Sequence, residues 1–189
     1  MITSAPFMSC RENKEVTREI ADAVIDSLEF AAKGDCIRGR LAVARLPRLA
    51  DVLANRDGWL DCELSGWQEK GRAGATADKF GLRLRVSGRL GMGCQRCLAE
   101  VGVDCHIDSR LLLVPPGAEW PEDELEADDY DAIPAERELS VLSLVEEEVL
   151  LALPAVPRHE KCGLPGDPGP QEEESRPSPF AVLAGLKKH

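Results

Sequence analysis

Two pairs of residues in this chain carry side chains that bind borderline or soft metal ions, Cys94 with Cys97 and His159 with Cys162. Two residues separate the cysteines of the first pair, and this spacing lets one tight turn present both thiolates to a single tetrahedral ion. A shared ion would then hold the distal pair against that turn. The spacing predicts one structural zinc bound by all four side chains, in a closed site with no position left for a substrate.

A redox function and a site without metal are the alternatives. The C-x-x-C spacing also occurs in thioredoxin-type redox pairs, in which a helix N-terminus lowers the pKa of the attacking thiol. Residues from Leu98 onward alternate as in a strand, so no helix is expected there and zinc is favoured over redox chemistry. Spacing alone leaves open whether the fold brings the two pairs together. The remaining cysteines are interpreted as core or incidental thiols: Cys10, Cys36, Cys62 and Cys105.

Four arginines gather on one side of a predicted strand and at the turn beyond it. They are Arg83, Arg85, Arg89 and Arg96. One interpretation is a solvated sheet face, on which they pair with acids of the neighbouring strand such as Asp61 or Glu63. The other is a phosphate-binding stripe for RNA, which is a serious alternative because the rest of the chain is so acidic. No aromatic residue interleaves these arginines, so base stacking is not predicted.

No catalytic constellation is recognisable. The sequence has no Walker loop and none of the motifs G-x-G-x-x-G, G-x-S-x-G or H-E-x-x-H. The run Glu146-Glu147-Glu148 lies within a predicted helix and is interpreted as a solvated face, because no histidine accompanies it as a catalytic partner. The sequence thus indicates a binding or assembly protein with no small-molecule substrate, and not an enzyme.

Composition favours one domain with appendages in a reducing compartment. The 189 residues are 43% hydrophobic, enough for a core, and a formal net charge of −11 repels a polyanion except at a local basic face. Seven cysteines is an odd number, which argues against a disulfide framework. No apolar stretch of about 18 residues occurs, so neither a membrane span nor a secretion signal is expected. The expected location is the cytoplasm.

Hydrophobic periodicity predicts an α+β fold, in which N-terminal and C-terminal helices cover an antiparallel β-meander. The predicted helices span residues 15–33, 46–54 and 140–153, the last capped by Ser140. The predicted strands span residues 37–43, 59–67, 82–90 and 99–114, and alternation is cleanest over 82–90. The Cys94–Cys97 turn joins the last two strands and is therefore expected at the tip of a hairpin.

The predicted domain covers residues 1–162 and includes an acidic loop over 119–138. Residues 163–178, rich in Gly, Pro and Glu, are predicted to form a flexible linker. Residues 179–189 form a short apolar segment with a basic tip. This tail is predicted to insert into a groove of a partner, with docking on its own domain as the alternative. Its contact residues would be Phe180, Leu183, Leu186, Lys187 and Lys188.

Several strings of residues resemble the YceD family, and together they extend over almost the whole chain. They are Asp26–Ala31 (DSLEFA), Leu46–Leu49 (LPRL), Gly93–Leu98 (GCQRCL), Leu144–Pro154 (LVEEEVLLALP) followed by His159 and Cys162, and Ser178–Lys187 (SPFAVLAGLK). The helix and the tail are the specific elements, whereas C-x-x-C alone is a weak signal. The resemblance implies a large ribosomal RNA subunit accumulation protein.

This resemblance leads to the functional hypothesis. Proteins of the family are needed for synthesis, processing or stability of 23S rRNA, so the expected partners are the 23S rRNA precursor, large-subunit ribosomal proteins, or both. The expected role is a non-enzymatic factor in large-subunit assembly. Two rival hypotheses are a redox or metal-handling protein built on Cys94 and Cys97, and a protein-binding adaptor that never touches RNA.

Overall fold

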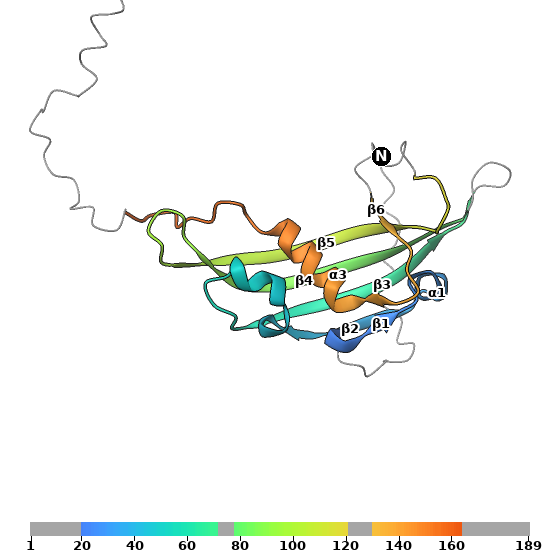
Figure 1. Cartoon of the computed structure of the whole chain (residues 1–189), viewed down its shortest axis with the longest axis horizontal. Helices are drawn as coiled ribbons and strands as arrows, with labels where there is room; N and C mark the ends of the chain where they lie inside the picture. Colours follow the sequence, from blue (N-terminus) through green and yellow to red (C-terminus); the bar gives the residue numbers. More distant parts are fainter. Residues whose placement is uncertain (1–19, 72–77, 121–129, 164–189) are drawn as a thin grey trace, which may run out of the picture.

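The computed structural model describes residues 20–71, 78–120 and 130–163, and its main feature is a five-stranded sheet (Figure 1). The strands follow the chain order: β2 (Cys36–Ala42), β3 (Trp59–Glu69), β4 (Lys79–Gly93), β5 (Glu100–Val114) and β6 (Asp131–Pro134). Strands β2 to β5 are antiparallel neighbours, whereas β6 runs parallel to β5. The chain is therefore an α+β protein with a mostly antiparallel sheet, as predicted, apart from the parallel edge strand.

The sheet has an apolar inner face and a polar outer face, because successive side chains of a strand point to opposite sides. On β4 the inner side chains Leu82, Leu84 and Val86 are at most 2% exposed. Arg83 and Arg85 lie between them and belong to the outer face. Burial of the inner face is the main stabilising contribution to this fold.

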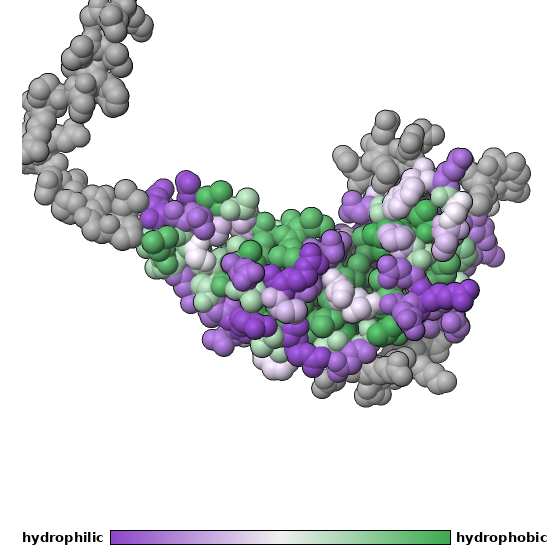
Figure 2. All heavy atoms as spheres, viewed as in Figure 1, coloured by the Kyte–Doolittle hydropathy of each residue, from purple (hydrophilic) through white to green (hydrophobic). Residues whose placement is uncertain are grey.

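Two α-helices contribute to the core on the inner face, α1 (Ser27–Lys33) and α3 (Val141–Ala152). The carboxylate of Asp26 accepts the N–H of Glu29 at the start of α1, and the helix ends at Gly34, whose φ of 64° suits glycine. Figure 1 shows α3 lying across the sheet. In the same view, apolar side chains gather in the middle of this face and hydrophilic ones surround them (Figure 2).

A short second ladder brings the starts of the two helices together. Strands β1 (Val24–Ile25) and β7 (Leu139–Ser140) pair antiparallel. Next to this ladder, the N–H of Ser27 donates to the carbonyl of Glu136 at 2.9 Å, and the N–H of Val141 donates to Ala23 at 3.0 Å. The hydroxyl of Ser140 accepts the N–H of Ser143 and caps α3, as predicted.

Three predicted elements differ from the structure. The helix predicted over 15–33 is a 3-10 turn at Ile20–Asp22 and then α1, because residues 24–25 pair with β7 instead. The helix predicted over 46–54 is the 3-10 helix Pro47–Asp51, one of whose N–H groups is bound by a residue of α3. Part of the predicted acidic loop over 119–138 forms β6, which covers the edge of β5.

Some expectations fall on residues that the structure does not describe. These are 1–19, 72–77, 121–129 and 164–189, which include nearly all of the predicted linker and the whole predicted tail. Within the described ranges, no helix has both the length and the apolar character needed to cross a membrane.

Candidate functional site

The turn that joins β4 to β5 holds Cys94 and Cys97 at the tip of a long hairpin, as predicted. The N–H of Cys94 donates to the carbonyl of Ala99 at 2.8 Å, and the N–H of Leu98 donates to the carbonyl of Cys94 at 2.9 Å. Leu98 has a φ of 62°, a left-handed conformation that few non-glycine residues adopt. The chain thus bends sharply enough at Leu98 for both cysteines to lie on the same side of the turn.

The segment after α3 returns to this turn. The N–H of Gln95 donates to the carbonyl of Pro157 at 2.9 Å, and the guanidinium of Arg96 donates to the carbonyl of Cys162 at 2.9 Å. Figure 1 shows this segment beside the β4–β5 hairpin. Arg96, one of the four arginines predicted to bind RNA, therefore holds the second ligand pair against the first.

The four predicted ligands converge at one place. Their ligand atoms all lie within 4.8 Å of one another. The Sγ atoms of Cys94 and Cys162 are 3.7 Å apart. Two sulfurs bound to one tetrahedral zinc, each about 2.3 Å from it, would be about 3.8 Å apart. The Sγ of Cys97 lies 3.4 Å from Nδ1 of His159, a separation that also suits a shared ion. The donor set, three sulfurs and one imidazole nitrogen, is a known structural zinc type.

The orientation of His159 is fixed from outside the cluster. Its Nε2 lies 2.9 Å from the carbonyl oxygen of Glu100, so Nε2–H donates and Nδ1 faces the sulfurs as an acceptor. Metal-binding histidines are generally oriented by such a hydrogen bond from the second ring nitrogen. The geometry of the ring therefore suits a ligand.

Backbone donors surround the sulfur of Cys94. They lower the pKa of this thiol to about 5, mainly through the N–H of Cys97. The N–H of Arg96 lies 3.5 Å from the same sulfur. Burial raises the pKa of the Cys162 thiol. Cys94 is fully buried, and no helix begins at Cys97. A thiolate that is stabilised yet inaccessible suits a metal ligand better than a redox nucleophile.

The other described cysteines differ from these four. Cys62 and Cys105 lie in the core as predicted, and burial raises the pKa of both thiols, that of Cys62 to about 12. Cys36 is disulfide-bonded, so the expectation of an isolated thiol at this position is wrong. Neither Cys62 nor Cys105 belongs to a group of three or more metal-binding side chains among the described residues.

The other three arginines predicted to bind RNA form ion pairs on the outer face. Arg83 binds Asp108 with two hydrogen bonds of 2.6 Å. Arg85 lies 3.6 Å from both Glu63 and Asp108, and Arg89 lies 3.7 Å from Asp104. Pairing with acids of the neighbouring strands therefore occurs, although the acids on β5 were not foreseen.

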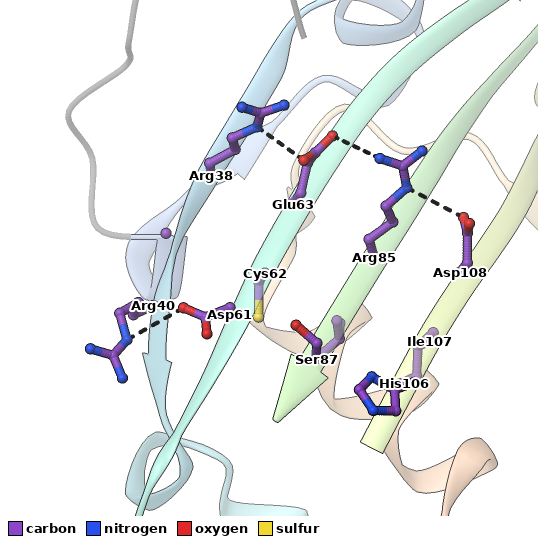
Figure 3. Close-up of a pocket in the computed structure, with 12 residues that line it drawn as sticks. Arg38, Arg40, Asp61, Cys62, Glu63, Arg85, Ser87, His106, Ile107 and Asp108 are labelled. Carbon is purple, nitrogen blue, oxygen red and sulfur yellow. Dashed lines mark ion pairs between the residues drawn. The ribbon is translucent and has the colours of Figure 1, made fainter. Parts of the chain in front are cut away.

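One row of the outer face alternates in charge across four strands. Arg38, Glu63, Arg85 and Asp108 lie side by side in the register of β2 to β5. Figure 3 shows their ion pairs along the edge of an open hollow. Asp61, the other predicted acid, pairs instead with Arg40, whose guanidinium lies 5.6 Å from the centre of the Trp59 ring.

The acidic run of α3 is not a solvated face throughout. Glu146 is 4% exposed, and its carboxylate accepts the N–H of Arg48 at 2.6 Å. The side chain of Glu147 pairs with the Arg48 guanidinium, and Glu148 accepts a hydrogen bond from Ser109 on β5. Sequence reasoning missed these roles.

The chain was compared with known proteins. The profile of a family described as "Large ribosomal RNA subunit accumulation protein YceD" matches residues 82–187. A Haemophilus influenzae protein with that same description is 32% identical over 106 residues, which are 50% of this chain and 58% of that protein. The chain thus spans little more than half the length of this curated relative. No solved structure matches the chain. Because the profile covers more than half of the chain, including most of β4, all of β5, the four-ligand cluster and α3, the chain belongs to the YceD family of large ribosomal RNA subunit accumulation proteins.

Proposed function

We propose that this protein supports accumulation of the large-subunit ribosomal RNA, 23S rRNA, as a non-enzymatic assembly factor in the cytoplasm. The observation that carries the proposal is the family match over residues 82–187. Those residues include the hairpin and the helix that the four-ligand cluster joins. The proposed partners are the 23S rRNA precursor and large-subunit ribosomal proteins.

Zinc in the four-ligand cluster is the second part of the proposal. Cys94, Cys97, His159 and Cys162 would occupy all four positions of a tetrahedral ion, so the ion would be structural and not catalytic. It would join the segment after α3 to the β4–β5 hairpin. The proposed benefit is a fixed position for the C-terminal end of the domain, from which the predicted tail at 179–189 extends.

The outer face is the proposed site of RNA contact. It carries Arg83, Arg85 and Arg89 on β4 in an otherwise acidic chain. Guanidinium groups are strong donors to phosphate, and each of these side chains also forms an ion pair with an acid of a neighbouring strand. Arg89 is the most exposed, with 70% of its side chain accessible.

Depletion and complementation test the proposed function. Removing the protein from its native host should lower the ratio of 23S to 16S rRNA, and the wild-type chain should restore it. A Cys94→Ser/Cys97→Ser variant should restore it poorly, whereas Cys105→Ala, a core cysteine outside the cluster, should restore it. An unchanged ratio after depletion would contradict the proposal.

A further inference from the structure

A second hollow lies at the other end of the sheet from the four-ligand cluster. It has a volume of about 620 Å³, which is within the usual range for small-ligand sites. Its charged lining consists of three cations and one anion: Lys33, Arg83, Arg110 and Asp35. Since the chain as a whole carries −11, a local excess of positive charge here favours an anionic ligand.

Two aromatic side chains form part of the wall of this hollow. Trp67 on β3 lies across Gly81 of β4, where a Cβ atom would come within 2.1 Å of the indole ring. Tyr130 packs beside it, with ring centres 5.3 Å apart. Both residues line the hollow and are partly exposed. The indole Nε1 of Trp67 is itself buried, without a hydrogen-bond partner among the described residues.

Two arginines face each other next to these rings. Arg83 and Arg110 are direct partners in the β4–β5 register. Arg83 binds Asp108, whereas the exposed Arg110 forms no ion pair with the described residues. Like charges directly opposite each other destabilise a sheet. The pair Arg83 and Arg110 lies next to the row of alternating charge on the outer face. Together they hold four arginines and two carboxylates: Arg38, Arg83, Arg85, Arg110, Glu63 and Asp108.

We propose that this hollow binds one nucleotide of a single-stranded RNA segment. The base would stack on Tyr130 at the edge of Trp67, and the phosphate would bind Arg110. Aromatic surface beside paired guanidinium groups is the combination that single-strand binders use. An acidic protein segment would use only the arginines. This inference rests on the proposed role in rRNA accumulation, and it names the chemistry of one contact.

The sequence alone does not indicate this site. The aromatic residues come from β3 and from the residue before β6, so they do not interleave with the arginines of β4 along the chain. Strand register places them together, since Trp67 lies opposite Gly81, two residues before Arg83. The sequence does not single out Arg110, because only the β4–β5 register shows that it lies opposite Arg83.

The test is fluorescence anisotropy with a labelled 12-nucleotide single-stranded RNA and the full chain. Arg110→Gln should weaken binding about tenfold and reduce the salt slope by roughly 0.7. Its melting temperature should stay the same or rise, because a like-charge pair is removed. Tyr130→Ala should weaken RNA binding about fivefold or more. If the melting temperature of this variant falls, Tyr130→Leu replaces it in the binding measurement. Arg45→Gln is the control, an equal charge change just after β2, whose other end, at Cys36, lines the hollow.

The outcomes separate this inference from the proposed function. The nucleotide site would be overturned if Arg110→Gln and Arg45→Gln lost equal amounts of RNA affinity. It would also be overturned if the wild-type chain bound no RNA. If depletion still lowered 23S rRNA in that case, the proposed function would stand without it. A mononucleotide that competes as strongly as the RNA would show a free-nucleotide site, and polyglutamate that competes as strongly would show a general anion site. Either result would overturn the RNA assignment.

Discussion

The backbone N–H of Arg48 donates to the buried carboxylate of Glu146 at 2.6 Å, although 98 positions separate the two residues. This bond joins the LPRL string to the VEEEVL string, two of the sequence features that resemble the YceD family. It holds the two segments together in the fold. The first supplies an N–H group at the start of a 3-10 helix, and the second supplies the carboxylate that accepts from it.

Glu146 is therefore predicted to stabilise the domain. Glu146→Ala leaves the N–H of Arg48 without its acceptor at a partly buried position and should lower the free energy of unfolding by about 1–3 kcal/mol. Glu146→Gln keeps an acceptor oxygen and should cost less. Glu147→Gln is the control, because its exposed ion pair should contribute at most about 1 kcal/mol. Urea unfolding of the three variants is the measurement, and equal effects at both positions would contradict the assigned role.

Zinc binding is predicted for the protein purified without chelators. Elemental analysis should find one zinc per chain, and well under one in Cys97→Ser and Cys162→Ser. Cys105→Ala should retain the metal, since this thiol lies in the core and outside the cluster. Chelation should lower the melting temperature, because the ion joins two distant segments. A wild-type protein with no zinc that melts unchanged after chelation would show that the four side chains form no metal site.

Acid should weaken one ion pair of the outer face. The hydrogen bonds from Arg83 hold the pKa of Asp108 below its usual value. A carboxyl with a depressed folded pKa stabilises the protein above its unfolded pKa, and this contribution is lost as the pH falls through the folded pKa. The wild-type protein should lose more stability than Asp108→Asn between about pH 5 and pH 2. The difference should stay below about 1 kcal/mol, because the carboxylate is half exposed.

Urea unfolding at pH 6 and at pH 3 measures this difference. Asp104→Asn is the control, since its ion pair with Arg89 is longer and more exposed. Added salt should shrink the effect. Parallel stability profiles for the wild-type protein and Asp108→Asn would show that the pair does not stabilise the fold.

Deletion of the predicted tail tests the binding of partners. A chain that ends before Ser178 should keep its melting temperature and lose co-sedimentation with large-subunit precursors, because residues 179–189 are predicted to insert into a partner. A chain with a scrambled tail of the same composition is the control and should also fail to co-sediment. A large fall in melting temperature would instead show that the tail packs on its own domain.

Much of the fold could be predicted because local patterns agree with the tertiary structure. Alternation over β4 and the Ser140 cap each gave an element in the right place. The 3-10 helix at Pro47–Asp51 and the edge strand β6 could not be predicted, because both depend on partners far along the chain. Ligand spacing identified each of the two ligand pairs, but only the fold brings the pairs together. The second hollow depends on strand register and has no local signature in the sequence.

Crosslinking in living cells followed by sequencing of the bound RNA tests the proposed RNA contact most directly. We expect enrichment of 23S rRNA precursor over 16S rRNA with the wild-type protein, and a clear reduction with the Arg110→Gln variant at equal protein level. Crosslinks confined to ribosomal proteins would favour the adaptor hypothesis. Absence of both 23S rRNA and large-subunit proteins from the crosslinked material would contradict the proposed function.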